Sequence, residues 1–150
     1  MTRPVLAIDP GPEESGWCLL GADGVPTHAG NDPNDALLGR LHTHAADLVI
    51  EMVASYGMPV GRDIFATCVW IGRFQQATPE PERVTLTPRL DVKLHLCHSP
   101  RAKDANVWQA LVDRFGAPGT KKAPGVLYGI TKHARAALAL AVTHYDRRGA

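Results

Sequence analysis

Two short apolar runs, PVLAID at residues 4–9 and DLVIEMV at residues 47–53, contain acids and are separated by a segment with a helical pattern. Runs of this length are typical of buried strands, and a Pro-Gly pair ends the first one. In the intervening segment, Asp32 is a candidate N-cap and Pro33 suits the first helical position. A helix between two strands favours a parallel crossover connection, so the chain is predicted to be an α/β protein.

Further patterns complete a mixed sheet. Residues 15–30, SGWCLLGADGVPTHAG, predict two strands joined by a turn at Asp23-Gly24, which makes a three-stranded antiparallel meander with the first run. RVTLTP at residues 83–88 adds a fifth strand, whereas RLDVKLHLC at residues 89–97 fits either a helical turn or a continued strand. Helices are predicted over residues 62–77, residues 103–116, and from Thr131 as N-cap to about Arg148.

Length and composition favour a single domain over residues 1–150, of which 45% are hydrophobic. No apolar stretch approaches the roughly 20 residues that span a bilayer, and the N-terminus lacks a signal-peptide pattern. We therefore expect no membrane association and a cytoplasmic location. The cysteines are odd in number, widely spaced and set among apolar neighbours, which favours reduced thiols. They are Cys18, Cys68 and Cys97.

Charge is divided unevenly along the chain, although the net charge is only +1. Residues 1–75 carry four Lys/Arg and nine Asp/Glu, whereas residues 76–150 carry twelve and six. This division is expected if one region grips phosphates and the other supplies carboxylates for cations. Chance segregation on a solvated surface is the alternative.

The acids inside the two apolar runs, Asp9 and Glu51, are the candidate metal ligands. A carboxylate inside an apolar strand is costly unless a partner or a metal stabilises it. If the strands are parallel neighbours, both side chains converge at one edge of the sheet and form an oxygen-lined site suited to Mg²⁺ or Mn²⁺. The alternative is that Asp9 caps the turn that follows it and Glu51 faces solvent from an edge strand.

The last predicted helix, TKHARAALALAV, opens with cations where the helix macrodipole favours acids. Lys132, His133 and Arg135 lie in its first turn. Ala136 follows His133 by three residues, on the same helical face, where a site built from a helix would place its next functional side chain.

Four stretches in order along the chain resemble the RuvC family of Holliday-junction resolvases. They are AIDPGPEESGW, DLVIEMV, TPRLDVK followed by KDANVWQALVDRFG, and KHARAALALA. The resemblance covers nearly the whole chain and implies a ribonuclease-H-like fold, a homodimer, and cleavage of four-way DNA junctions by two-metal hydrolysis with Mg²⁺ or Mn²⁺. It implies no nucleotide cofactor, and the small size fits a bacterial or phage-encoded enzyme.

Carried over by position, Asp9 matches the first-strand aspartate that bridges both metals, and Glu51 matches the glutamate that holds one of them. His133 matches the first ligand of the last helix, and Lys103 matches a lysine near the scissile phosphate. The position of an expected aspartate is occupied by Ala136, which cannot bind a metal. Either a deliberate aspartate-to-alanine change or a natural loss of one ligand explains it, and in both cases we expect the chain to bind junctions and cut them poorly or not at all.

Basic side chains are candidate DNA contacts. We predict phosphate contacts for Lys132 and Arg135 beside the site, for Lys121 and Lys122 in the preceding loop, and for Arg73 on the helix over residues 62–77. A solvated loop is an equally good explanation for the lysine pair.

The helix over residues 62–77 is more apolar than one buried face requires. Its apolar residues around Ile64, Val69, Trp70 and Phe74 favour a symmetric dimer through this helix.

Three functions stay open from the sequence. The first is a RuvC-type, metal-dependent junction endonuclease with an impaired site. The second is a junction-binding protein that has lost catalysis, and the third is a ribonuclease-H-like nuclease for other branched or flap DNA.

Overall fold

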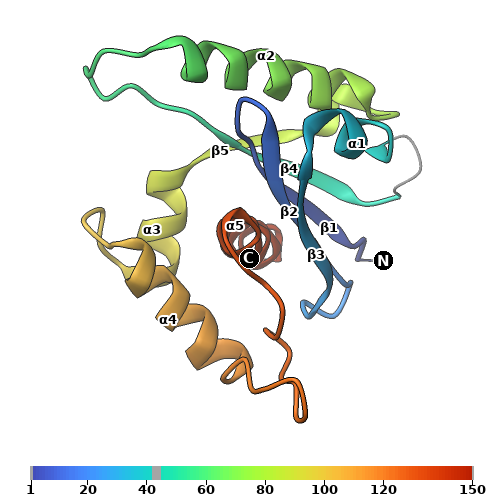
Figure 1. Cartoon of the computed structure of the whole chain (residues 1–150), viewed down its shortest axis with the longest axis vertical. Coiled ribbons are helices and arrows are strands. Elements are labelled where there is room, and N and C mark those ends of the chain that lie inside the picture. Colours follow the sequence, from blue (N-terminus) through green and yellow to red (C-terminus); the bar gives the residue numbers. More distant parts are fainter. Residues whose placement is uncertain (1, 42–44, 150) are drawn as a thin grey trace.

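The structure, a computed structural model, describes residues 2–41 and 45–149, which form a five-stranded sheet with helices on both faces (Figure 1). In chain order the elements are β1 (Val5–Asp9), β2 (Glu14–Leu20), β3 (Pro26–Pro33), α1 (Asn34–Leu38), β4 (Asp47–Met52), α2 (Arg62–Ala77), η2 (Pro81–Arg83), β5 (Thr85–Pro88), α3 (Arg89–Cys97), α4 (Asp104–Phe115) and α5 (His133–Arg148). The strand order is β3-β2-β1-β4-β5. This is the mixed sheet that the sequence predicts.

Strand β1 separates the antiparallel half of the sheet from the parallel half. It pairs antiparallel with β2 and parallel with β4. Strand β3 extends the antiparallel half, and β5 pairs parallel with β4. The predicted meander and the predicted crossover are therefore both confirmed. The C-terminal ends of β1, β4 and β5 lie at one edge of the sheet because the three strands run in the same direction.

Side chains alternate across β1, so that each face of the sheet has its own core. Val5 and Ala7 pack in the cluster that includes the buried residues of α5, whereas Leu6 and Ile8 pack in the cluster that includes Phe74 of α2. Helix α5 thus covers one face, α1 and α2 cover the other, and α3 and α4 pack beside α5 (Figure 1).

The alanine content of α5 is explained by its central position. Every residue over 137–143 is buried. Small side chains let the helix axis lie close to the sheet, while the charged residues are confined to the first and last turns. The helix is therefore a core element along most of its length.

Three local predictions need correction or completion. Asp32 does not cap α1: it belongs to β3, where its carboxylate accepts a hydrogen bond from Nε1 of Trp17 at 2.6 Å, and α1 begins after Pro33. Helix α5 begins one residue after Lys132, so Thr131 is not its N-cap. Residues 89–97, which the sequence left open, form helix α3, and His98 ends it in the left-handed conformation.

The three cysteines, all within the described part of the chain, are free thiols. Of the helices in that part of the chain, none is both long and apolar enough to cross a bilayer.

Candidate functional site

Two carboxylates lie at the sheet edge where β1 and β4 end. Ile8 pairs with Ile50 in the parallel register, so Asp9 and Glu51 follow at equivalent positions, on the face that α5 covers. Asp9 is only 5% exposed. Strand β4 lies between β1 and β5, so Glu51 is not on an edge strand. The structure therefore places the two acids side by side, as the parallel-strand argument predicts.

His133, at the start of α5, reaches the same point. Its Nδ1 lies 2.9 Å from Oδ2 of Asp9. The helix comes this close to β2 because residue 16 is glycine: a Cβ at Gly16 would lie 2.2 Å from the carbonyl carbon of His133. Gly16 pairs with Asp9 in the sheet. The glycine that leaves room for the start of α5 is therefore next to the carboxyl group that His133 contacts.

The start of α5 is held by a side chain from β3. Oδ1 of Asn31 accepts a hydrogen bond from the N–H of Ala134 at 3.1 Å, and its Nδ2 donates to the carbonyl of Thr131 at 2.9 Å. Lys132 takes a positive φ of 52° between them. Of the basic residues in this first turn, His133 contacts the buried carboxyl group of Asp9, whereas Arg135 turns aside to stack on Trp108.

An arginine that the sequence argument did not use is central to the site. Nε of Arg89 lies 2.7 Å from Oε1 of Glu51, and Nη2 lies 3.4 Å from Oε2, a two-point contact. Nη2 also lies 3.9 Å from Oδ1 of Asp9, and Nη1 lies 3.5 Å from Oδ1 of Asp104 at the start of α4. One guanidinium therefore contacts three carboxylates from β1, β4 and α4.

The two buried acids differ in proton affinity. Burial, together with the hydrogen bond and the charge of Glu51, raises the pKa of Asp9 to about 9. Burial acts upward on the pKa of Glu51 as well, but the hydrogen bonds from Asp9 and Arg89 outweigh it and lower that pKa. The two carboxyls titrate as a coupled pair in which Asp9 holds its proton more tightly than Glu51, the acid that Arg89 contacts at two points.

A cleft of about 650 Å³ opens from these residues between α3, α4 and α5. Besides Arg89, the basic side chains along it include Lys93, Lys132 and Arg135, and its apolar wall includes Trp108 and Leu111. The lining thus combines basic side chains with the acids Asp9, Glu51 and Asp104.

The donor set does not fit a two-metal centre. Ala136 lines the cleft next to His133 but offers no ligand atom. Within residues 2–41 and 45–149, no three His, Cys, Asp or Glu side chains are grouped closely enough to hold a metal ion. Arg89 already supplies a positive charge to Asp9 and Glu51, the carboxylates that would ligate a metal ion. The described residues thus bring two acids and a histidine together without the number of ligands that two divalent cations require.

The other predicted site residues lie in different places. Arg135 lines the cleft, stacked on Trp108 with its guanidinium carbon 4.0 Å from the ring centroid. Lys103 is the exposed N-cap residue of α4 and is not among the residues that line the cleft. The same is true of Lys121 and Lys122, which are exposed in a short hairpin turn. Arg73 lies on α2, on the opposite side of the sheet.

Arg89, Asp104 and Lys93 are site residues that the sequence argument missed. Arg89 follows β5 directly, and β5 pairs parallel with β4, so the edge rule that identified Asp9 and Glu51 applies to it as well. Asp104 and Lys93 carried no such indication, because the packing of α3 and α4 beside α5 is not visible in the sequence.

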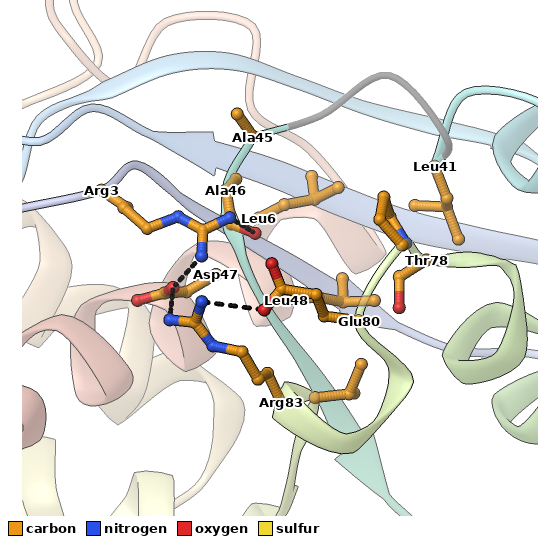
Figure 2. Close-up of a pocket in the computed structure, with 12 residues that line it drawn as sticks. Arg3, Leu6, Leu41, Ala45, Ala46, Asp47, Leu48, Thr78, Glu80 and Arg83 are labelled. Carbon is orange, nitrogen blue, oxygen red and sulfur yellow. Dashed lines mark hydrogen bonds and ion pairs between the residues drawn. The ribbon is translucent and has the colours of Figure 1, made fainter.

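A second pocket, of about 290 Å³, lies at the opposite edge of the sheet, where β4 begins (Figure 2). Asp47 is its central acid and lies 3.7 Å from Arg3 and 3.9 Å from Arg83. Arg148, at the end of α5, also pairs with Asp47 at 2.6 Å. These contacts tie the last turn of α5 to the start of β4, and the pocket has no part in the carboxylate site.

Strand order, strand direction and a helix that delivers a side chain to the β1 carboxylate define the ribonuclease-H-like fold of the RuvC type. The solved structure of Thermus thermophilus RuvC is similar to this chain with a TM-score of 0.70 and 21% identity, over 97% of this chain and 96% of that one. T. thermophilus RuvC in complex with Holliday junction substrate is similar with a TM-score of 0.68 and 22% identity, over 98% and 96%. No family model matches the sequence, and no curated protein matches it significantly.

Proposed function

We propose that this chain binds four-way (Holliday) or other branched DNA through the cleft beside Asp9, in DNA recombination or repair. The observation that carries the proposal is the convergence of Asp9, Glu51 and His133 at one sheet edge of a RuvC-like fold. The structural relative bound to a Holliday junction substrate supports the choice of DNA. Lys93, Lys132 and Arg135 are the side chains that we assign to backbone phosphates.

The reaction that such a site performs in intact form is divalent-metal-dependent hydrolysis of a phosphodiester, with Mg²⁺ or Mn²⁺. We infer that this chain retains little of that endonuclease activity, because Ala136 removes one negative charge and one ligand. Asp146 is no substitute, since it lies ten residues further along α5, about 15 Å away at 1.5 Å per residue. The chain is therefore proposed as a junction-binding protein with an impaired nuclease centre.

The decisive experiment is cleavage of a synthetic four-way junction by the chain and by Ala136→Asp, with Mg²⁺ and with Mn²⁺, and with binding followed by gel shift. We expect both proteins to bind the junction and only Ala136→Asp to cut it, because the added carboxylate gives a divalent cation the further ligand that it needs to compete with Arg89. The expected gain over the parent is at least about 100-fold, the size of loss that one catalytic group commonly causes. Ala136→Asn is the matched control, because it adds the same volume without the charge and should leave cutting at the parent level.

Linear duplex, flap and splayed-arm DNA complete the substrate panel. If neither protein binds the four-way junction but flaps are bound, the resolvase-type function is wrong and the fold serves another branched DNA. Cutting of the junction by the unmodified chain at the rate of Ala136→Asp would contradict the inference of an impaired centre.

A further inference from the structure

Arg89 lies among the acids at the sheet edge where β1 and β4 end. Its guanidinium contacts Glu51 at two points and also lies within 4 Å of an oxygen of Asp9 and of an oxygen of Asp104. These three acids come from β4, β1 and α4, so no local turn accounts for the arrangement. The arginine is the positive charge around which the acids are grouped.

The backbone holds Arg89 in this place. It is the first residue of α3, directly after β5, and Pro88 precedes it with φ −69° and ψ 152°. Pro88 pairs with Met52 in the sheet, which fixes the point where the chain turns into the helix. Glu51, one residue before Met52, is therefore next to the start of α3, and the arginine reaches it without spanning a gap.

Charge favours the arginine over a metal in this chain. Arginine is always protonated and presents a planar fork that matches a carboxylate, whereas a divalent cation needs several hard ligands. Ala136 leaves the site one carboxylate short of the pattern in which the helix supplies an aspartate, and Arg89 adds a positive charge close to Glu51. A metal ion that bound Asp9 and Glu51 would have to displace the guanidinium or tolerate its repulsion.

We propose that Arg89 is the resident cation of this site, taking the place of a divalent metal, and that the chain consequently engages DNA phosphate there without any metal. The DNA part of this inference rests on the proposed function, whereas the metal part does not. The guanidinium is half-buried and lines the cleft, and its contact with the exposed Asp104 through Nη1 is long, at 3.5 Å, so a phosphate oxygen can compete for the donors on Nη1.

The first test measures Mn²⁺ binding by calorimetry and by electron paramagnetic resonance, for the whole chain and for Arg89→Met. We expect the unmodified chain to bind Mn²⁺ with a Kd above about 1 mM and Arg89→Met to bind it at least about tenfold more tightly. Arg89→Lys keeps a positive charge and should stay as weak as the parent. Arg101→Met, which removes an exposed arginine from the turn between α3 and α4, is the matched control and should change nothing.

Circular dichroism and thermal melting establish that each variant is folded. If Arg89→Met does not fold, Arg89→Gln replaces it, because glutamine still donates a hydrogen bond to Glu51. Binding of Mn²⁺ by the unmodified chain at micromolar Kd, with no tightening in a folded neutral variant of Arg89, would overturn the proposal.

The second test measures junction binding by gel shift in EDTA and in Mn²⁺. We expect EDTA to leave the affinity of the unmodified chain unchanged, and Arg89→Met to lose at least about tenfold in EDTA and to recover part of it in Mn²⁺. A requirement for metal in the unmodified chain would overturn the proposal. If the unmodified chain binds no junction under either condition, the proposed function fails, and the Mn²⁺ titration alone decides the role of Arg89.

Discussion

Gly16 is the residue on which the approach of α5 to the sheet depends. Its missing side chain leaves room for the backbone of His133 and for the N–H of Ala134, which a Cβ would meet at 2.5 Å or less. A larger residue at position 16 would push the start of α5 away from Asp9. His133 can contact Asp9 because residue 16 has no side chain in the space between the strand and the helix.

Gly16→Ala is expected to destabilise the protein by about 1–3 kcal/mol, the usual range for overpacking, because the backbone contacts cannot yield as a flexible side chain would. Urea denaturation measures this directly. Gly72→Ala in α2 is the control: nothing lies within 4 Å of its Cβ, and replacing a helical glycine should stabilise by about 0.5–1 kcal/mol. Equal stability of Gly16→Ala and the parent would show that α5 does not make this close approach.

At the scale of the element, the start of α5 relies on a cap from another strand. Asn31 lies about 100 residues before the groups that it binds, Ala134 and Thr131. We expect Asn31→Ala to cost about 0.5–2 kcal/mol in the free energy of unfolding, the range for loss of an N-cap. Asn31→Asp keeps the acceptor and should cost less. A loss in Asn31→Asp as large as in Asn31→Ala would assign the stabilisation to the bond donated to Thr131.

The far end of α5 is linked to α3 and α4 through Asp146. Its carboxylate accepts two hydrogen bonds from Arg114, at 2.7 and 2.6 Å, and lies 2.8 Å from Nε2 of His95. The hydrogen bonds from Arg114 hold the pKa of Asp146 below its ordinary value, against the opposing effect of partial burial. The ionised form is therefore the one that the folded state stabilises.

Because the folded pKa of Asp146 is lowered, its contribution to stability is present above the ordinary pKa of about 4 and is lost as the pH falls through the folded pKa. Asp146→Asn should lower the free energy of unfolding by about 1 kcal/mol at pH 7, discounted for its solvent exposure. The difference from the parent should shrink below about pH 4, as urea melts across pH 3–7 would show. A difference that is independent of pH would assign the effect to packing.

At the scale of the whole molecule, α2 leaves apolar side chains on the surface. Phe74 faces the sheet and is fully buried, whereas Phe65 is 60% exposed and Val69 is 63% exposed. Ile64 and the loop residues Tyr56 and Met58 are exposed as well. A symmetric dimer through α2, as the sequence predicts, would cover apolar side chains of this helix.

The dimer prediction is tested by sedimentation at micromolar concentration. We expect the parent to sediment as a dimer and the double variant Phe65→Glu, Val69→Glu to sediment as a monomer. In a symmetric interface each new carboxylate would be buried close to the same carboxylates of the second copy, and the like charges would repel one another. Gln76→Glu places the same charge on an exposed polar position of α2 and should remain dimeric. A monomeric parent would remove the prediction.

The amino-acid sequence was sufficient to predict the sheet and its two acids. Apolar runs at residues 4–9 and 47–53 with a helical pattern between them predict parallel neighbours, and a carboxylate near the carboxyl end of each run then lies at the same edge of the sheet. Local patterns carry this information because strand burial and alternation depend on near neighbours in the chain. The bounds of α2, residues 62–77, were predictable for the same reason.

What only the tertiary structure decided is which distant groups complete these elements. Asp32 pairs with Trp17 instead of capping a helix, Asn31 caps α5 from β3, and Arg89 enters the carboxylate site from the start of α3. Each of these side chains could form a hydrogen bond or an ion pair with several other groups of the chain. Packing decides which group lies within reach, and that packing brings together segments far apart in the sequence.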